Sequence, residues 1–157
     1  MSGNEPEIRR YEGDRDALRP LFGEADDSEQ EIDVYLPLGE VLVATDDDRL
    51  VGHLQLIDLP GNDLELKSMA VVEEWRGTGV GRALVTEAVR HGRKRERSRM
   101  LVATATADIG NLRFYQRLGF RMLRIERNAF GPSTGYPDGI VIDGIPLLDR
   151  VWLDRDL

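Results

Sequence analysis

The sequence predicts an α/β fold in which a mixed, mostly antiparallel central sheet of about seven strands is flanked by about four helices. The first half carries β-branched runs separated by turn signals, such as Asp46-Asp47-Asp48 between residues 41–45 and 50–59, which is typical of antiparallel hairpins. In the second half, apolar residues recur at helical spacing over Val80–Lys94 and Asp108–Leu118. Each of these helical segments follows a strand-like run, which favours crossover units added to the hairpins.

Turn and capping residues define the elements of the first half. Asp14 suits a helix N-cap, Gly23 suits a helix end, and Pro60-Gly61-Asn62 marks a turn. The expected order is a strand, two short helices and three strands: Glu7–Tyr11, Asp14–Phe22, Glu29–Leu36, Val41–Thr45, Leu50–Leu59 and Leu64–Val72. On the last strand, alternation separates Leu64, Leu66, Ala70 and Val72 from an exposed face with Glu65, Lys67, Met69 and Val71.

The second half is expected to alternate helices and strands and to close with a hairpin. Its elements, in order, are Val80–Lys94, Met100–Thr106, Asp108–Leu118, Phe120–Phe130, the hairpin Ile140–Leu147 and Arg150–Leu153. Gly119 stands where a helix C′ residue belongs, and Asp143-Gly144 indicates a tight turn. Because no linker interrupts the pattern, residues 1–157 are predicted to form a single domain.

Composition and charge exclude several classes of protein. With 21 basic and 29 acidic side chains in 157 residues, the formal net charge is −8, which argues against a nucleic-acid partner. The absence of cysteine excludes disulfides and thiolate chemistry, and two histidines make a metal site unexpected. No apolar run approaches the roughly 18 residues of a membrane span. Since Met1–Glu7 also lacks a signal peptide's apolar run, a cytoplasmic protein is expected.

A glycine-rich loop joins the strand ending at Val72 to the helix that follows. It consists of Arg76, Gly77, Thr78, Gly79, Val80, Gly81 and Arg82. Glycine lets the backbone approach a ligand closely, and successive N–H groups at a helix N-terminus favour a phosphate. A dinucleotide fingerprint would need glycine at Arg82, and a Walker loop would need Gly-Lys-Ser/Thr, so neither motif fits. The alternatives are a loop that only turns tightly and a nucleotide site of another kind.

A second motif lies on the helix that ends before Gly119. Its stripe holds Asn111, Phe114, Tyr115 and Leu118 at i, i+3, i+4 and i+7. Phe114 and Leu118 are interpreted as core, whereas Asn111 and Tyr115 are expected to have polar roles.

The two motifs together resemble the GNAT superfamily of N-acetyltransferases. Glu65–Val72 followed by Arg76-x-x-Gly79-x-Gly81 is similar to that family's motif A. Asn111-x-x-Phe114-Tyr115-x-x-x-Gly119-Phe120 is similar to its motif B. The resemblance implies the GNAT fold, acetyl-CoA as acyl donor and direct transfer of the acetyl group to an amine.

The resemblance also implies site residues. Backbone groups of the bulged strand Met69-Ala70-Val71 would bind the pantetheine arm, with Asn111 nearby, and the amides from Gly77 to Arg82 would hold the pyrophosphate. The N–H of Val71 would polarise the thioester carbonyl. Tyr115 would protonate the departing thiolate, a role that a phenol near sulfur can perform.

Two further groups are the general base that accepts the proton and the amine that accepts the acetyl group. In the resembled family a carboxylate near Glu65 often serves as general base, and His53 on the neighbouring strand is an alternative. An acidic stretch that would attract a cationic amine contains Glu24, Asp26, Asp27, Glu29, Glu31 and Asp33. Thr106-Ala107-Asp108 replaces the Glu-Val-Arg of enzymes that acetylate ribosomal-protein N-termini, which argues against that substrate.

The sequence thus predicts an N-acetyltransferase that acts on a primary amine of a small molecule or peptide. The alternative is a catalytically silent acyl-CoA-binding or interaction module on the same fold, which an occluded acceptor cleft or an inaccessible Tyr115 would favour. The closing hairpin is expected either to wall the acceptor pocket or to mediate formation of a homodimer.

Overall fold

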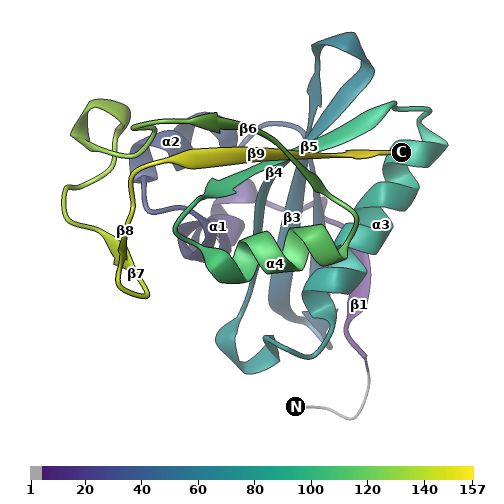
Figure 1. The fold of residues 1–157 in the computed structure, drawn as a ribbon. Helices are drawn as coiled ribbons and strands as arrows, with labels where there is room; N and C mark the ends of the chain where they lie inside the picture. The colour runs from purple at the N-terminus through teal and green to yellow at the C-terminus, as the bar shows by residue number, and fades with distance from the viewer. Residues whose placement is uncertain (1–4) are drawn as a thin grey trace.

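A seven-stranded sheet forms the centre of the structure, a computed structural model that describes residues 5–157 (Figure 1). Its strands lie in the order β1-β2-β3-β4-β5-β9-β6. Their bounds are Glu7–Arg10, Glu40–Asp46, Arg49–Leu59, Asp63–Val71, Arg99–Ala105, Arg150–Asp156 and Arg121–Glu126, in that spatial order. β4 and β5 run parallel and the other neighbouring pairs are antiparallel, which confirms the predicted mixed sheet. Residues 1–4 of the predicted domain lie outside the described residues.

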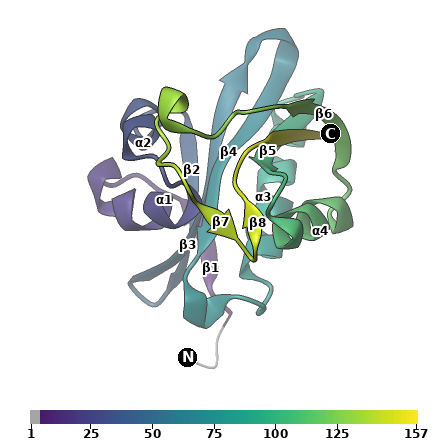
Figure 2. The same cartoon turned by 60° about the vertical axis from the view of Figure 1, so that its left-hand side comes forward.

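The helices cover both faces of this sheet (Figure 2). They are α1 (Arg19–Ala25), α2 (Glu29–Tyr35), α3 (Val80–Lys94) and α4 (Ile109–Arg117). α1 and α2 cover one face, where Phe22 and Ile32 pack on Val43. α3 and α4 lie on the other face, over the larger core. The predicted end of the first helix at Gly23 was wrong, because Asp14 caps a short 3₁₀ turn and α1 then runs to Ala25.

The two parallel strands separate halfway along their length. β4 pairs with β5 only from Asp63 to Leu66, opposite Arg99 to Val102. Beyond this point β4 continues beside β3 and β5 continues beside β9. Because a central strand bonds to a neighbour on each side, the β5-facing backbone groups of β4 beyond Leu66 have no strand partner in the described structure.

A bulge on β4 changes which side chains share a face. Ser68 pairs with Gln55 and Leu66 pairs with Leu56, so Lys67 is the extra residue. Met69 and Val71 therefore pack against the same core as Leu66, beneath α3. The alternation read from the residues was wrong on this strand, because one extra residue exchanges the faces of everything that follows. The bulged strand that the family resemblance implied is present.

The C-terminal region wraps around the end of the sheet (Figure 2). β6 ends at Glu126 rather than near Phe130, since the backbone of Asn128 has a φ of 58° and leaves the extended conformation. The following segment turns at Pro132–Thr134 beside α2 and reaches a two-stranded hairpin, β7 (Val141–Ile142) and β8 (Ile145–Pro146). The hairpin forms a separate sheet, and its Asp143-Gly144 turn is confirmed.

Candidate active site

A cavity of about 370 Å³ lies where β4 and β5 separate. The strands, α4, the α1–α2 segment and the C-terminal loop all contribute to its wall. Among its lining residues are Glu65, Met69, Thr104, Asn111, Tyr115, Tyr136 and Trp152. The cavity therefore unites both sequence motifs with segments far from them in the chain.

Tyr115 enters this cavity from α4. Its side chain is only 4% exposed and its ring packs edge-on against Phe114 and Phe120, with centroids 5.2 and 5.6 Å away. Its hydroxyl has no hydrogen-bond partner among residues 5–157, although it lines the cavity. Burial raises the pKa of Tyr115 above that of a free phenol, and the charge of Asp108 adds to the effect. The group is thus held protonated and available to donate.

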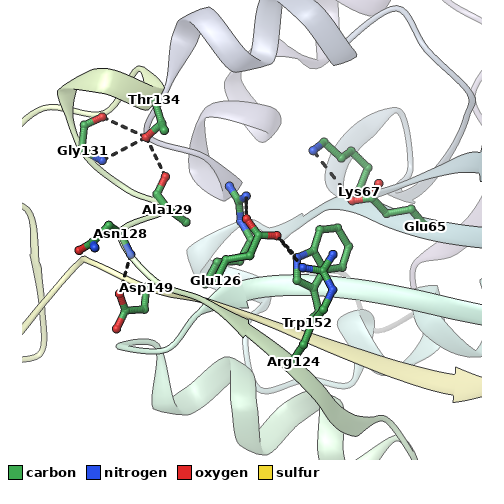
Figure 3. A network of polar contacts seen from close by, with 11 residues as sticks. Glu65, Lys67, Arg124, Glu126, Asn128, Ala129, Gly131, Thr134, Asp149 and Trp152 are labelled. Atoms are coloured by element: carbon green, nitrogen blue, oxygen red, sulfur yellow. Dashed lines mark hydrogen bonds and ion pairs between the residues drawn. The ribbon is translucent and has the colours of Figure 1, made fainter.

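Glu65 lies in the same cavity, on the part of β4 that still pairs with β5. The sequence placed it on an exposed face, but it is only 8% exposed. Burial raises the pKa of Glu65, while the positive charges of Lys67 and Arg150 oppose this shift. The Lys67 ammonium lies 3.9 Å from the Glu65 carboxylate (Figure 3). Glu65 therefore combines low solvent exposure with flanking cations.

The glycine-rich loop precedes α3 and stands close to the open edge of β4. Gly79 is the N-cap of α3 with a φ of 94°, and within the described chain no side chain caps this helix end. The first N–H groups of a helix have no intrahelical partner, so they remain available to a ligand. Arg76 connects the loop to its surroundings, since it donates to the Val71 carbonyl (3.0 Å) and to Glu24 (3.2 Å).

These features fit the two parts of an acyl-CoA molecule. The uncapped helix end, with positive φ at Gly77 and Gly79, suits a pyrophosphate. The strand edge left unpaired beyond Leu66 suits an amide-containing arm that bonds as a strand would. Gly81 was expected to let the ligand approach the backbone. In the structure, a Cβ at this position would lie 3.3 Å from the Phe114 ring, so the missing side chain makes room for Phe114.

Asn111 joins α4 to β5 at the cavity wall. Its side-chain amide donates to the Thr104 hydroxyl (3.2 Å), and its backbone N–H is capped by Asp108 (3.0 Å). Asp108, which replaces the arginine of ribosomal-protein acetyltransferases, therefore has a structural role as helix N-cap. The two bonds fix Asn111 between Tyr115 and the strand.

His53, the alternative proton acceptor, lies outside this cavity. It is fully buried, stacks on Phe22 at 4.4 Å and contacts the Ser68 hydroxyl at 2.8 Å. Burial lowers the pKa of His53 to about 3, so the imidazole is a weak base. These contacts support a structural role.

One part of the cavity wall is acidic and aromatic. Carboxylates from the α1–α2 segment line it, namely Glu24, Asp26, Asp27 and Glu31. Phe130 and Arg150, to which the sequence analysis gave no role, also line it, and the Arg150 guanidinium lies 5.0 Å from the Phe130 ring. Glu126 accepts from Arg150 and from the Trp152 indole (Figure 3). Only the tertiary fold brings these residues together, because the α1–α2 segment lies far from β6, β9 and the loop between them in the sequence.

Comparison with known proteins identifies the family. The sequence profile of the acetyltransferase (GNAT) family matches residues 9–120. The chain belongs to the GNAT family. It is 32% identical over 150 residues to "Uncharacterized N-acetyltransferase YvbK" of Bacillus subtilis (strain 168), with 96% of each chain covered.

Solved GNAT structures share the whole fold. A Bacillus subtilis acetyltransferase in complex with CoA is 31% identical, has a TM-score of 0.88 and aligns over 98% of this chain and 99% of that chain. A GNAT acetyltransferase of Elizabethkingia anophelis with acetyl-CoA bound is 27% identical, with a TM-score of 0.90 and the same coverage. The protein is thus an acetyl-CoA-dependent acyltransferase of the GNAT family. Within residues 5–157, no cluster of three or more potential metal ligands occurs.

Proposed function

We propose that this GNAT enzyme acetylates a primary amine of a small molecule or peptide, with Tyr115 as general acid and Glu65 as general base. The observation that carries the proposal is that both side chains line one cavity, at the separation of β4 and β5. The donor is assigned to the loop and to the strand edge, through Met69, Ala70, Val71, the amides of Gly77–Arg82, and Asn111.

The proposed reaction needs two proton movements. Acetyl-CoA supplies an acetyl group already activated as a thioester. As the amine nitrogen forms its bond to the carbonyl carbon, Glu65 accepts the nitrogen's proton, directly or through water. The Val71 N–H donates to the carbonyl oxygen, which gains negative charge. When the carbon–sulfur bond breaks, the Tyr115 hydroxyl gives its proton to the sulfur.

The charge of the cavity wall favours a cationic acceptor. Glu24, Asp26, Asp27 and Glu31 face the cavity on the side of α1 and α2, against Lys67 and Arg150. This excess of negative charge raises the local concentration of ammonium groups. An ammonium bound there must first release one proton to solvent, and Glu65 then accepts the second proton as the nitrogen attacks.

A silent acyl-CoA-binding module fits the structure less well. An occluded cleft or an inaccessible Tyr115 would have favoured that alternative, whereas Tyr115 lines the same cavity as the acidic wall. The test is a panel of mono-, di- and polyamines, amino acids and short peptides, with CoA thiol release as the readout. Thiol release that requires an amine and gives an N-acetyl product by mass spectrometry supports the proposal. Acetyl-CoA binding without transfer to any amine would overturn it.

The same proposal places the enzyme in the cytoplasm without a nucleic-acid or membrane partner. The basic residues after α3 are largely engaged in ion pairs, as with Arg95 and Asp58 (3.0 Å) or Arg99 and Asp63 (2.8 Å). No helix within residues 5–157 is both long and apolar enough to span a bilayer. The β7–β8 hairpin, whose Ile142 lines the cavity, is proposed either to wall the acceptor pocket or to mediate a homodimer, and the molecular mass in solution tests the homodimer.

A further inference from the structure

Asp26 accepts hydrogen bonds from two tyrosines that line the cavity and come from separate segments of the chain. The Tyr35 hydroxyl of α2 donates to one carboxylate oxygen at 2.6 Å. The Tyr136 hydroxyl, 110 residues away in sequence, donates to the other oxygen at 2.8 Å. The backbone N–H of Ser28 also donates to the carboxylate, at 3.1 Å. Since both oxygens are occupied, Asp26 serves as a bridge between two chain segments.

The two segments that Asp26 bridges are in close contact with each other. Gly135, with a φ of 90°, lies beside the N-cap of α2, where a Cβ would be 2.9 Å from the Ser28 hydroxyl. Figure 2 shows the segment after β6 crossing to α2. Thr134 braces that segment internally by donating to the Ala129 carbonyl at 2.7 Å (Figure 3). The segment thus has internal hydrogen bonds of its own, and Asp26 links it to α2 through Tyr136 and Tyr35.

The tyrosines in turn support the groups around Glu65. The Lys67 ammonium lies over the Tyr35 ring, 4.9 Å from its centroid. Tyr136 packs edge-on against Phe130 at 4.9 Å, and Arg150 lies over that ring. Lys67 and Arg150 are the cations whose charges act on Glu65. A continuous arch of side chains thus runs from β4 through Asp26 to β9.

We propose that Asp26 is a positioning residue that closes this arch and so sets the shape of the acceptor pocket. The inference rests on the proposed acetylation of an amine at this cavity. Asp26 contacts none of the groups assigned to the donor or to proton transfer. We call the pair of hydrogen bonds from Tyr35 and Tyr136 to Asp26 the clamp. Loss of the clamp should therefore weaken acceptor binding and leave acetyl-CoA binding intact.

Three variants separate the effect of the clamp on acceptor binding from the effect of the Asp26 charge. Asp26→Asn removes the charge and weakens both tyrosine bonds, while Tyr35→Phe/Tyr136→Phe removes the bonds and keeps the charge. Asp27→Asn removes one charge from the same wall and leaves the clamp. We expect the first two to raise the acceptor KM by about tenfold or more, because small misplacements of binding groups are costly. Asp27→Asn should raise it less, and kcat should change by less than about threefold in all three.

A second measurement needs no acceptor. Hydrogen exchange should become faster over residues 29–36 and 130–136 in Asp26→Asn and in the double phenylalanine variant, and stay slow in Asp27→Asn. If Asp26→Asn and Asp27→Asn raise KM equally while the double variant behaves as wild type, charge alone acts and the clamp is overturned. Unchanged exchange in both clamp variants would overturn it as well. Failure of the wild-type enzyme to acetylate any amine would instead refute the proposed function, and exchange would still decide the clamp.

Discussion

At the level of single residues, burial acts in the same direction on the two proposed proton-transfer groups, because it disfavours their charged forms. Tyr115 is kept as a neutral phenol and Glu65 is made a stronger base than an exposed carboxylate. An acid that stays protonated and a base that binds protons more readily are the pair that acyl transfer to an amine requires.

Tyr115→Phe keeps the ring, and with it the packing on Phe114 and Phe120, and removes only the hydroxyl. We expect kcat with the best acceptor to fall by about one to three orders of magnitude, since general acids typically contribute about 10²–10⁴-fold. The loss should be partial, because a thiol with a pKa of about 8.5 can leave unassisted. Calorimetry should give nearly unchanged acetyl-CoA affinity. A fully active Phe variant would show that Tyr115 is only part of the core.

Glu65→Gln should lower kcat/KM for the amine by about 10–100-fold near neutral pH. A base must be ionised to act, so wild-type activity should be lost as the pH falls through the raised pKa of Glu65. The glutamine variant should lack this acid limb. Because the amine's own ionisation gives a second limb, profiles are measured with two acceptors of different pKa. If the acid limb of the pH profile shifts with the pKa of the acceptor in both the wild type and Glu65→Gln, the role of Glu65 is contradicted. Glu87→Gln on α3 serves as the control variant.

At the level of elements, the start of α3 combines a backbone that only glycine adopts easily with free N–H groups. Gly79→Val forces a β-branched residue to a φ of 94° and places a side chain beside the proposed pyrophosphate. We expect acetyl-CoA affinity to fall by about 100-fold or more, because the phosphate can no longer approach the backbone. Calorimetry on the folded variant measures this.

Gly61→Val is the matched control for that substitution. Gly61 also has a positive φ, 77°, with open space around it, but it lies in the turn between β3 and β4. Both variants should lose similar amounts of stability in thermal unfolding, and only Gly79→Val should lose the ligand. Equal affinities in the two variants would remove the loop from the donor site.

At the level of the whole molecule, His53 couples the packing of α1 on the sheet to pH. Its folded pKa of about 3 lies below the unfolded value of about 6.5, so the unfolded state binds the proton more readily. Its contribution to stability is therefore complete above pH 6.5 and is lost as the pH falls toward 3.

Between pH 6.5 and 5 the free energy of unfolding should fall by up to about 2 kcal/mol from this residue, since one proton contributes at most about 1.4 kcal/mol per pH unit. Denaturant titrations at several pH values measure the slope. His53→Asn should flatten it even if the variant is less stable overall, whereas His91→Asn should retain it. An unchanged slope in His53→Asn would assign the pH dependence to carboxylates.

Local patterns in the sequence were enough to predict the element order, the length of α3 and the helix end at Gly119, and to reveal the two GNAT motifs. Helical period, capping residues and glycines act over a few neighbours, so they are readable without the fold. The order of the motifs then predicted the donor, and the family comparison confirmed it. The roles of Tyr115 and Glu65 stay predictions.

Only the tertiary structure decided the rest of the site. The family resemblance implied a bulge on this strand, but its position at Lys67 depends on how β4 pairs with β3, and a single-residue shift in register exchanges the two faces of a strand. The burial of Glu65, which the alternation had placed in solvent, depends on distant segments of the chain that line the same cavity. The clamp of Tyr35 and Tyr136 on Asp26 joins segments 110 residues apart, and no local pattern encodes such a contact. The sequence by itself thus determined the family and the acyl donor, whose motifs are local, whereas long-range packing decided the shape and charge of the cavity.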